Sequence, residues 1–282
     1  MCFGVRDAIA LATRQSAPVT IFGELVHNET VLDDLRRRGI KIESEISRID
    51  TGTVMVTAHG TSGRQLRQLQ ENGFAVVEAT CPLVHHAHRA LRNLVTAGYH
   101  PIIVGRRDHV EVRGMTGDLD RFDVVLDEED VEKLEPRDRF GVVSQTTQPI
   151  DRVRHLVAMI GNRFPGAEVR FVDTVCQPTK QRQSSATELA KECDVVVVIG
   201  GRQSNNTREL VATCARVCPR VYQVQAAEDL RCEWFLDVEI VGITAGTSTP
   251  DGSIDEVENE IQRLGNLDPC EKESNLQPHG QR

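Results

Sequence analysis

Ten short runs of apolar and β-branched residues recur along this chain and alternate with stretches of helical periodicity. The runs are VTIF, TVMVT, FAVVEA, PIIVG, FDVVLD, FGVVS, VRFVD, VVVVIG, RVYQV and EIVGIT. Strands that are apolar on both faces need helices against both faces, as in parallel sheets joined by crossover helices. The pattern therefore predicts an α/β fold built on parallel sheets.

One unit of this pattern repeats three times. Each repeat has a cysteine that opens an amphipathic helix, then a strand that ends in glycine 21 to 24 residues later, then a strand that ends in a small polar cluster. The cysteines are Cys2, Cys81 and Cys176, the glycines are Gly23, Gly105 and Gly200, and the polar clusters centre on His59, Thr146 and Ser248. We predict three small α/β units in a pseudo-threefold arrangement, at residues 1–81, 82–175 and 176–264, with a polar tail at 265–282.

The start of the chain departs from this repeat. A strand leads into Cys81 and another into Cys176, whereas only Met1 precedes Cys2. Ordering a ligand on an untethered terminus costs roughly 1–2 kcal/mol for each backbone residue fixed. The repeat therefore predicts about ten upstream residues, an apolar strand and a glycine turn, that would tie Cys2 to the core.

The polar loops occupy the same place in each repeat, at strand-to-helix turns, where parallel sheets bind ligands. Donors in these loops are His27, His59, His109, Ser204, Asn205, Asn206 and Ser248. Several of them precede helices, whose N-terminal amides favour anions, so together they suit a diphosphate. Taken singly, each Ser or Asn could equally be a helix cap.

The three repeated cysteines suit an iron–sulfur cluster. Structural zinc usually takes close C-x₂₋₄-C pairs, which this trio does not contain. A [4Fe–4S] cluster held by three thiolates keeps one iron open for substrate. The alternative for each is burial at a strand end. Cys193, Cys214, Cys218, Cys232 and Cys270 fall outside the repeat and are interpreted as packing or surface residues, with a metal pair at Cys214 and Cys218 left open.

Glu111 is the one carboxylate in a predicted site loop that is placed to transfer a proton near the cluster. Its alternative role is that of a solvated loop acid.

Charge and composition limit the partners. With 33 Lys and Arg against 42 Asp and Glu, the net charge of −9 would repel a nucleic-acid backbone. No apolar run reaches the roughly 18–20 residues of a membrane span, and the N-terminus does not read as a signal peptide. We predict a cytosolic protein whose eight cysteines do not form a disulfide framework.

Eight motifs occur in the order and at spacings typical of one family: LVHN, TAHG, ATCPLV, HVE, SQTT, DTVCQPTKQRQ, QSNNT and TAGTSTP. From Cys2 to about Leu264 the chain resembles the LytB-type 4-hydroxy-3-methylbut-2-enyl diphosphate reductases, the last enzyme of the non-mevalonate isoprenoid route. The resemblance implies that the three repeated cysteines bind a [4Fe–4S] cluster whose open iron takes the substrate hydroxyl. It also implies a donor of single electrons such as ferredoxin or flavodoxin.

The resemblance further implies a role for each site residue. His27, His59, Ser204, Asn206 and Ser248 match positions that hold the diphosphate, and His109 lines the same pocket. Glu111 matches the proton donor, joined by Thr146 in a hydrogen-bond network around the hydroxyl, with Gln145 beside it. Loss of the hydroxyl as water, with two electrons and a proton, would give isopentenyl and dimethylallyl diphosphates.

Two rival functions remain at this point. A quinolinate-synthase-like enzyme also combines threefold α/β units with three cysteines, but a dicarboxylate would be expected to meet arginine forks, whereas these loops offer His, Ser, Asn and Thr. A non-enzymatic cluster-based redox sensor would need a partner surface or a basic DNA-binding module, and neither is evident in the sequence.

Overall fold

The structure is a computed structural model that describes residues 1–15 and 18–266. Its helices and strands form three sheets in chain order, and every strand pairing recorded is parallel. The predicted tail from residue 267 onward, including Cys270, lies outside the described residues. None of the helices described is both long and apolar enough to cross a bilayer.

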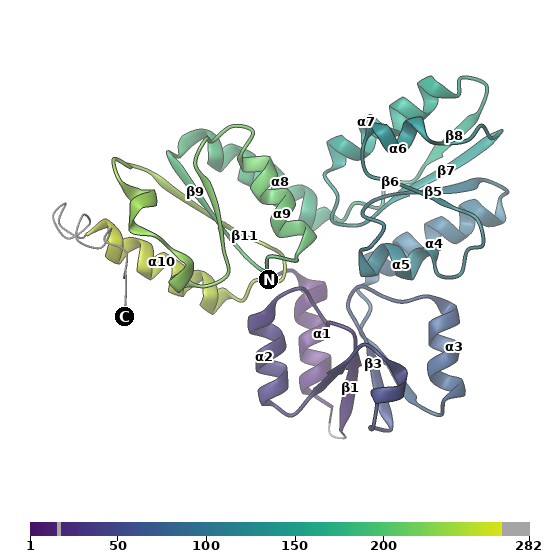
Figure 1. Ribbon diagram of the computed structural model, residues 1–282, viewed down its shortest axis with the longest axis horizontal. Helices are drawn as coiled ribbons and strands as arrows, with labels where there is room; N and C mark the ends of the chain where they lie inside the picture. Colours follow the sequence, from purple (N-terminus) through teal and green to yellow (C-terminus); the bar gives the residue numbers. More distant parts are fainter. Residues whose placement is uncertain (16–17, 267–282) are drawn as a thin grey trace, which may run out of the picture. The chain divides into compact units, whose positions relative to one another are not determined.

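Sheet A has the strand order β2-β1-β3-β4. Its elements are α1 (Phe3–Thr13), β1 (Val19–Phe22), α2 (Glu29–Arg37), β2 (Lys41–Glu43), η1 (Ile46–Arg48), β3 (Thr53–Val56), α3 (Gly63–Glu71) and β4 (Ala75–Glu78). Met55 of β3 packs against the α1 face of the sheet, whereas its neighbours Val54 and Val56 pack with Leu69 of α3. Figure 1 shows α1 and α2 on one side of these strands and α3 on the other.

Sheet B repeats this topology with the order β6-β5-β7-β8. Its elements are α4 (Pro82–Thr96), β5 (His100–Val104), α5 (Val110–Thr116), β6 (Asp123–Val125), α6 (Glu128–Glu132), β7 (Arg139–Ser144), α7 (Ile150–Arg163) and β8 (Glu168–Phe171). Val142 of β7 packs with Leu156 of α7, and Val143 packs with Leu94 of α4 on the opposite face. Both faces of the sheet are therefore buried.

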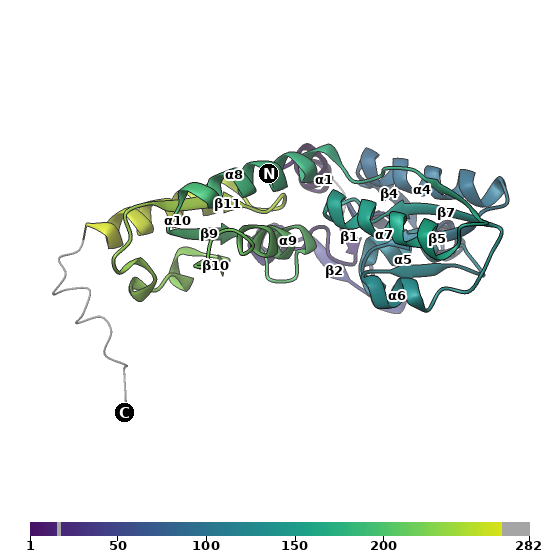
Figure 2. The same cartoon turned by 90° about the horizontal axis from the view of Figure 1, so that it is seen from above.

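Sheet C has the order β10-β9-β11. Its elements are α8 (Gln177–Glu192), β9 (Val195–Ile199), α9 (Asn205–Cys214), β10 (Val221–Val224), η2 (Ala227–Asp229), η3 (Cys232–Phe235), β11 (Val241–Ala245) and α10 (Asp251–Gly265). In Figure 2, β9 lies between β10 and β11. All five residues of β9 are buried, since Val197 packs toward α10 and Val196 toward α8 and α9.

The ten runs singled out in the sequence all form strands, so the predicted α/β fold with three parallel-sheet units is confirmed. The strand that was missed, β2, has the sequence KIE and half-exposed side chains, so it has no apolar run to signal it. Two compact units contain the described residues: Cys2–Lys180 holds sheets A and B, and the residues from Gln181 onward hold sheet C together with Met1. The exact unit boundaries at 81 and 175 stay a prediction.

The third repeat differs from the first two at one edge of its sheet. In sheet A, β4 pairs with β3, and in sheet B, β8 pairs with β7. In the described part of sheet C, no strand pairs with the corresponding edge of β11. The expected strand upstream of Cys2 stays a prediction.

Gly141 in β7 tests how tightly α4 packs on sheet B. A Cβ atom there would lie 2.9 Å from the Cβ atoms of both Leu94 and Tyr99, which the backbone holds in place. We expect Gly141→Ala to lower the free energy of unfolding by about 1–3 kcal/mol. Gly161→Ala is the control, since its Cβ would meet nothing within 4 Å and a helical alanine adds up to about 1 kcal/mol. Thermal denaturation that shows equal midpoints for the two variants would contradict this packing.

Candidate functional site

The three repeated cysteines occupy equivalent places at the starts of helices. Cys2 is the residue before α1, Cys81 the residue before α4, and Cys176 the residue before α8. Cys81 follows β4, and Cys176 follows β8, each the edge strand of its sheet. All three belong to the compact unit Cys2–Lys180, and all are free thiols.

The thiols of these cysteines are close neighbours. Burial raises the pKa of the Cys81 thiol, and the proximity of Cys2 raises it further. Burial likewise raises the pKa of the Cys176 thiol to about 11, with Glu111 and Cys2 adding to the effect. The backbone of α1 lies against Cys81, because a Cβ atom on Gly4 would sit 2.5 Å from the Cys81 Sγ. The fold therefore gathers three cysteines from distant parts of the chain.

Hydrogen-bond donors surround two of the sulfur atoms. The backbone N–H groups of Leu83 and Val84, at the start of α4, oppose the rise in the pKa of Cys81. The Cys176 Sγ lies 3.0 Å from the Thr179 Oγ1, and the Thr179 backbone also favours the thiolate. These donors stabilise negative charge on sulfur, the form that binds metals.

Within the described ranges, no group of three or more His, Cys, Asp or Glu residues forms a site for a single metal ion. A four-iron cluster is larger than a single ion and takes its thiolates from points farther apart. Half-buried free thiols with amide and hydroxyl donors beside them fit such a cluster.

The remaining described cysteines do not join this site. Cys214 and Cys218 are fully buried in the apolar core between sheet C and its helices, with Cys193 packed against it. The Cys218 Sγ contacts the carbonyl oxygens of Cys193, Asp194 and Arg220 at 3.4 to 3.6 Å. This environment fits packing residues, as the sequence predicted.

Three histidines from separate loops stack against one another. The rings of His27 and His59 lie 4.4 Å apart and nearly parallel, and His109 meets them edge-on at 5.2 and 5.7 Å. His27 follows β1, His59 follows β3, and His109 follows β5, so all three leave the carboxyl ends of parallel strands. The structure therefore brings these three loops together.

The surroundings of His59 disfavour its charged form. Burial lowers the pKa of this side chain well below 6.5, and His27 and His109 lower it further. Its Nδ1 atom is buried without a hydrogen-bond partner in the described residues. A buried, unsatisfied ring nitrogen costs free energy unless a ligand or water meets it. His27 is held differently, since its Nδ1 lies 2.9 Å from a carboxylate oxygen of Glu24.

Glu111 is almost completely buried, with 1% of its surface exposed, so it is not a solvated loop acid. It lies in the first turn of α5, where its own N–H donates to the His109 Nδ1. Its carboxylate accepts hydrogen bonds from the Thr146 N–H at 2.7 Å and the Thr146 hydroxyl at 3.0 Å. Burial still raises the pKa of Glu111 to about 7, because the two bonds offset only part of the desolvation.

Gln145 supports the loop that carries Thr146. The Gln145 Oε1 accepts hydrogen bonds from the Arg106 N–H at 3.1 Å and the Gln148 Nε2 at 3.2 Å. Gly105 is required beneath it, since a Cβ atom there would lie 2.8 Å from the Gln145 Cβ. Gln145 therefore ties the loop after β7 to the loop after β5 and does so from a fully buried position.

The polar residues of the third repeat lie in the other compact unit. Ser204, Asn205, Asn206 and Ser248 are all buried at turns after β9 and β11. Ser204 caps α9 by accepting from the Thr207 N–H, as the capping alternative predicted. Asn206 differs, because both atoms of its side-chain amide are buried and lack a partner within the described residues. An amide left in this state points to a missing ligand or water.

Two contacts were missed in the sequence. Thr179 touches the Cys176 sulfur, and Glu24 touches His27. Thr179 stands three residues after the cysteine that precedes a helix, and a side chain in the first turn can contact the residue before the helix. That spacing was the signal in the sequence. Nothing in the spacing of Glu24 separates it from other surface acids.

Comparison with known proteins agrees with this geometry. The chain matches the family described as LytB protein over residues 1–262. It is 36% identical to the 4-hydroxy-3-methylbut-2-enyl diphosphate reductase of Trichlorobacter lovleyi, with 94% of this chain and 95% of that protein covered. The reductase of the same name from Neisseria meningitidis serogroup C is also 36% identical, over 94% of this chain and 85% of that protein.

The chain belongs to the LytB family. Solved structures of the family agree. A 4-hydroxy-3-methyl-but-2-enyl diphosphate reductase described as the terminal enzyme of the non-mevalonate pathway superposes with a TM-score of 0.67 at 35% identity, covering 93% of this chain and 96% of that one. The Plasmodium falciparum reductase superposes with a TM-score of 0.86 at 25% identity, over 92% and 84%. These LytB relatives support neither the quinolinate-synthase-like alternative nor the redox sensor.

The raised pKa of Glu111 predicts a pH-dependent effect of Glu111→Gln on the metal-free protein. The unfolded chain ionises this carboxyl near pH 4.5 and the folded chain near 7, so folding loses stability as the pH rises through that window. Glu111→Gln removes this carboxyl group and with it a penalty of about 3 kcal/mol at the higher pH. We therefore expect the melting temperature of the variant, relative to that of the parent, to rise from about pH 5 to about pH 8.

Circular-dichroism melts at the two pH values measure this effect. The exposed Glu71→Gln is the control and should track the parent protein at both. A difference between Glu111→Gln and the parent that does not change with pH would show that Glu111 ionises normally in the folded protein.

Proposed function

We propose that this chain reduces 4-hydroxy-3-methylbut-2-enyl diphosphate to isopentenyl and dimethylallyl diphosphates in the non-mevalonate isoprenoid pathway. The observation that carries the proposal is a buried carboxyl group with a pKa near 7, placed beside three thiols and three histidines in a chain of the LytB family. Few surroundings keep a carboxylic acid partly protonated at neutral pH, and such groups serve proton transfer.

Cys2, Cys81 and Cys176 would hold a [4Fe–4S] cluster. When bound, that cluster supplies electrons one at a time and presents an open iron that polarises the substrate hydroxyl. The cysteines must first lose their protons, and burial of Cys176 makes this costly without metal. The N–H groups of Leu83 and Val84 and the hydroxyl of Thr179 then stabilise the thiolates.

The histidine group would bind the diphosphate. His59 would meet a phosphate oxygen through its buried Nδ1, which has no partner in the described residues. His27 and His109 complete the stacked group. We also assign Ser204, Asn205, Asn206 and Ser248 to substrate binding, on the strength of the two unsatisfied amide atoms of Asn206.

Glu111 would supply the proton. The balanced reaction replaces the hydroxyl of the allylic alcohol by hydrogen: one proton leaves with the hydroxyl as water, and two electrons and a second proton enter the carbon skeleton. Thr146 holds the Glu111 carboxyl through two hydrogen bonds and presents its own hydroxyl beside it. Gln145 orders the loop that carries Thr146, and it would lie beside the substrate hydroxyl.

The partners follow from this chemistry. The substrate is a small diphosphate, and a ferredoxin or flavodoxin would be the source of single electrons. We place the reaction in the cytosol.

Anaerobic purification followed by a turnover assay tests the proposal. We expect a brown protein with about four iron and four sulfide ions per chain. With a chemical reductant it should convert the allylic alcohol diphosphate to the two isomeric products. A colourless protein that holds zinc, or a cluster protein with no turnover, would overturn the assignment.

Two variants separate proton transfer from binding. We expect Glu111→Gln to keep its iron and its KM but to lose at least about 100-fold in kcat, because an amide cannot deliver the proton. We expect His59→Ala to keep its iron and to raise KM, because it removes a donor to the diphosphate. Steady-state kinetics with iron analysis measure both. Unchanged turnover in Glu111→Gln removes Glu111 from the mechanism, and loss of iron in His59→Ala makes His59 structural.

A further inference from the structure

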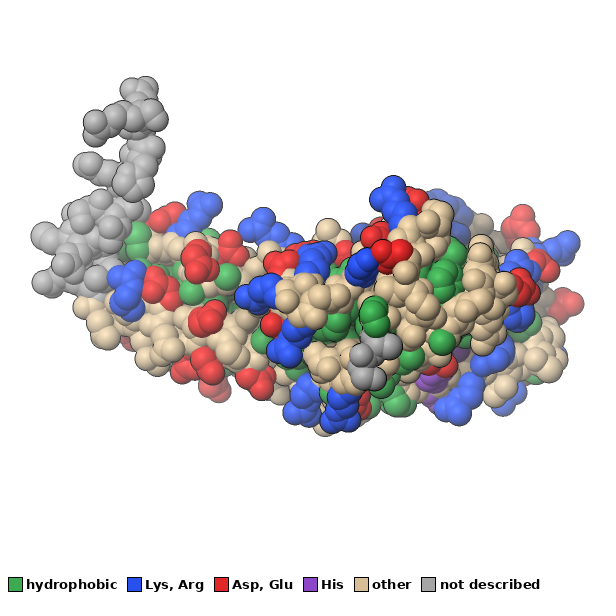
Figure 3. Space-filling model, turned by 90° about the horizontal axis from the view of Figure 1, so that it is seen from below, with side chains coloured by type: hydrophobic (Ala, Val, Ile, Leu, Met, Phe, Trp, Pro, Cys, Tyr) green, Lys and Arg blue, Asp and Glu red, His purple; other side chains and the backbone are tan. Residues whose placement is uncertain are grey.

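One segment of this acidic chain contains no acid. Residues 79–107 include four arginines and four histidines but no aspartate or glutamate, in a sequence with 42 acids among 282 residues. Elsewhere the charges mix, as acidic and basic side chains do over the face drawn in Figure 3. The segment holds Cys81, the whole of α4 and the whole of β5.

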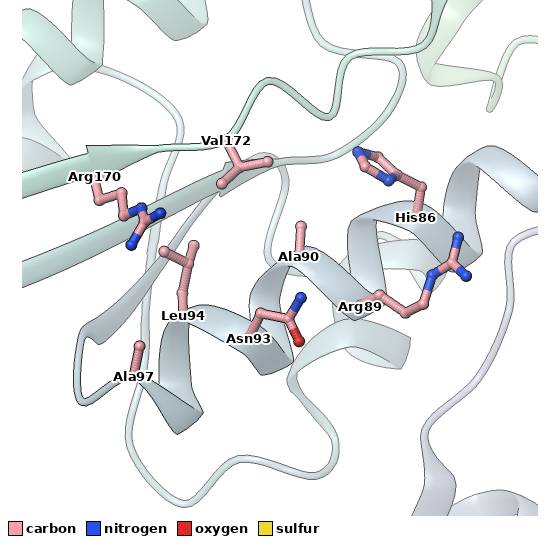
Figure 4. Close-up of a pocket in the computed structure, with 8 residues that line it drawn as sticks. All are labelled: His86, Arg89, Ala90, Asn93, Leu94, Ala97, Arg170 and Val172. Atoms are coloured by element: carbon pink, nitrogen blue, oxygen red, sulfur yellow. The ribbon is translucent and has the colours of Figure 1, made fainter.

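A basic groove lies along α4. It has a volume of about 340 Å³ and runs between α4 and the edge strand β8. Its polar lining is His86, Arg89 and Asn93 from α4 and Arg170 from β8, and its apolar lining is Ala90, Leu94, Ala97 and Val172. Figure 4 shows the α4 side chains and Arg170 on either side of the opening. The side chains of His86, Arg89, Asn93 and Arg170 are exposed.

The lining of the groove contains no carboxylate. Glu168 lies beside Arg170 at one end of the groove, where it accepts from Tyr99 and from the Arg139 Nε at 3.0 Å. Arg139 itself stacks over the Tyr99 ring at 4.0 Å. One carboxylate is thus shared by two arginines, and the groove keeps a net positive charge. Its floor is apolar, which suits a small protein interface with a charged rim.

The groove lies beside the protein segments that reach two of the cluster-binding cysteines. Its His86 is five residues into the helix that Cys81 opens, about 8 Å along the helix axis. Its Val172 stands four residues before Cys176. A redox partner seated at the His86 end of the groove would be close to the backbone that holds the cluster, whereas the Ala97 end lies about 24 Å from Cys81 along the helix axis. The rate of electron transfer falls steeply with distance.

We propose that the basic groove between α4 and β8 is the docking surface for an acidic ferredoxin. The proposal rests on the function proposed above. Each encounter would pass one electron from the reduced carrier, which leaves oxidised, and two encounters supply the two electrons that the reaction consumes. Redox partners form small, transient interfaces, and charge complementarity speeds their encounter more than it tightens their binding. A groove of this size with Arg89 and Arg170 in its lining fits that requirement.

The test is the double charge reversal Arg89→Glu with Arg170→Glu. Oxidised ferredoxin is titrated against the parent and the variant, and the dissociation constant is measured by calorimetry. We expect at least a tenfold weaker complex for the variant and, for the parent, a strong weakening between about 0.1 and 1 M salt, where the Debye length falls from about 10 to 3 Å. With reduced ferredoxin, kcat/KM for the carrier should fall by a similar factor.

Arg154→Glu is the matched control. Arg154 is an exposed residue of α7, which packs on the opposite face of sheet B from α4, and it should bind ferredoxin as the parent does. The milder pair Arg89→Gln with Arg170→Gln should give an intermediate effect. Melting temperatures of all variants check that the fold is intact. Equal weakening by Arg154→Glu, or none by the double reversal, overturns the proposed docking site.

A chemical reductant separates this proposal from the proposed function. Turnover driven by that reductant should be the same in the parent and the double reversal, since neither arginine touches the thiols, the histidines or Glu111. If no reductant drives turnover in the parent, the proposed function fails, while the binding titration still decides the docking site. If the reductant drives turnover but the two charge reversals leave the dissociation constant for ferredoxin unchanged, the proposed function stands and the proposed docking site is wrong.

Discussion

The three parallel sheets depend on the burial of both their faces. A strand such as β9, with five consecutive buried residues, is stable only between two layers of helices. That requirement dictates helical crossovers, and the crossovers bring every strand-to-helix turn to the carboxyl ends of the strands. The polar loops that carry the histidines, Glu111 and Thr146 are such turns. The site therefore follows from the way the apolar strands are covered.

The same packing explains the unusual state of the site. Glu111 lies in the first turn of a short helix whose other residues are largely buried, so its carboxyl group is held away from water. Two hydrogen bonds from Thr146 offset only part of the desolvation, which leaves the pKa near 7. The lowered pKa of His59 has the same origin, since burial and two neighbouring rings disfavour its charged form. Burial thus disfavours the charged forms of both side chains.

The buried surroundings of the thiols and the exposed groove along α4 differ in their electrostatic character. Inside, uncharged or partly protonated groups surround the thiols, and outside, an acid-free helix gives an acidic protein one basic groove. Both features start from Cys81, which opens α4 at its N-terminal end. The helix amides stabilise the thiolate, and the exposed face of the same helix carries the arginines. Under the proposed function, α4 would link the cluster site to the surface proposed to attract its electron donor.

The sequence by itself determined the fold class, ten of the eleven strands and the helix-opening position of each cysteine, because continuous apolar runs and a threefold repeat have few alternative interpretations. It missed β2, whose short exposed strand is defined by its pairing with β1. Only the tertiary structure decided that Glu111 is buried, that three histidines stack, that Thr179 touches Cys176 and that Arg170 faces α4 across a groove. Those facts depend on distances between residues far apart in the chain, and no local pattern encodes how much water each side chain loses.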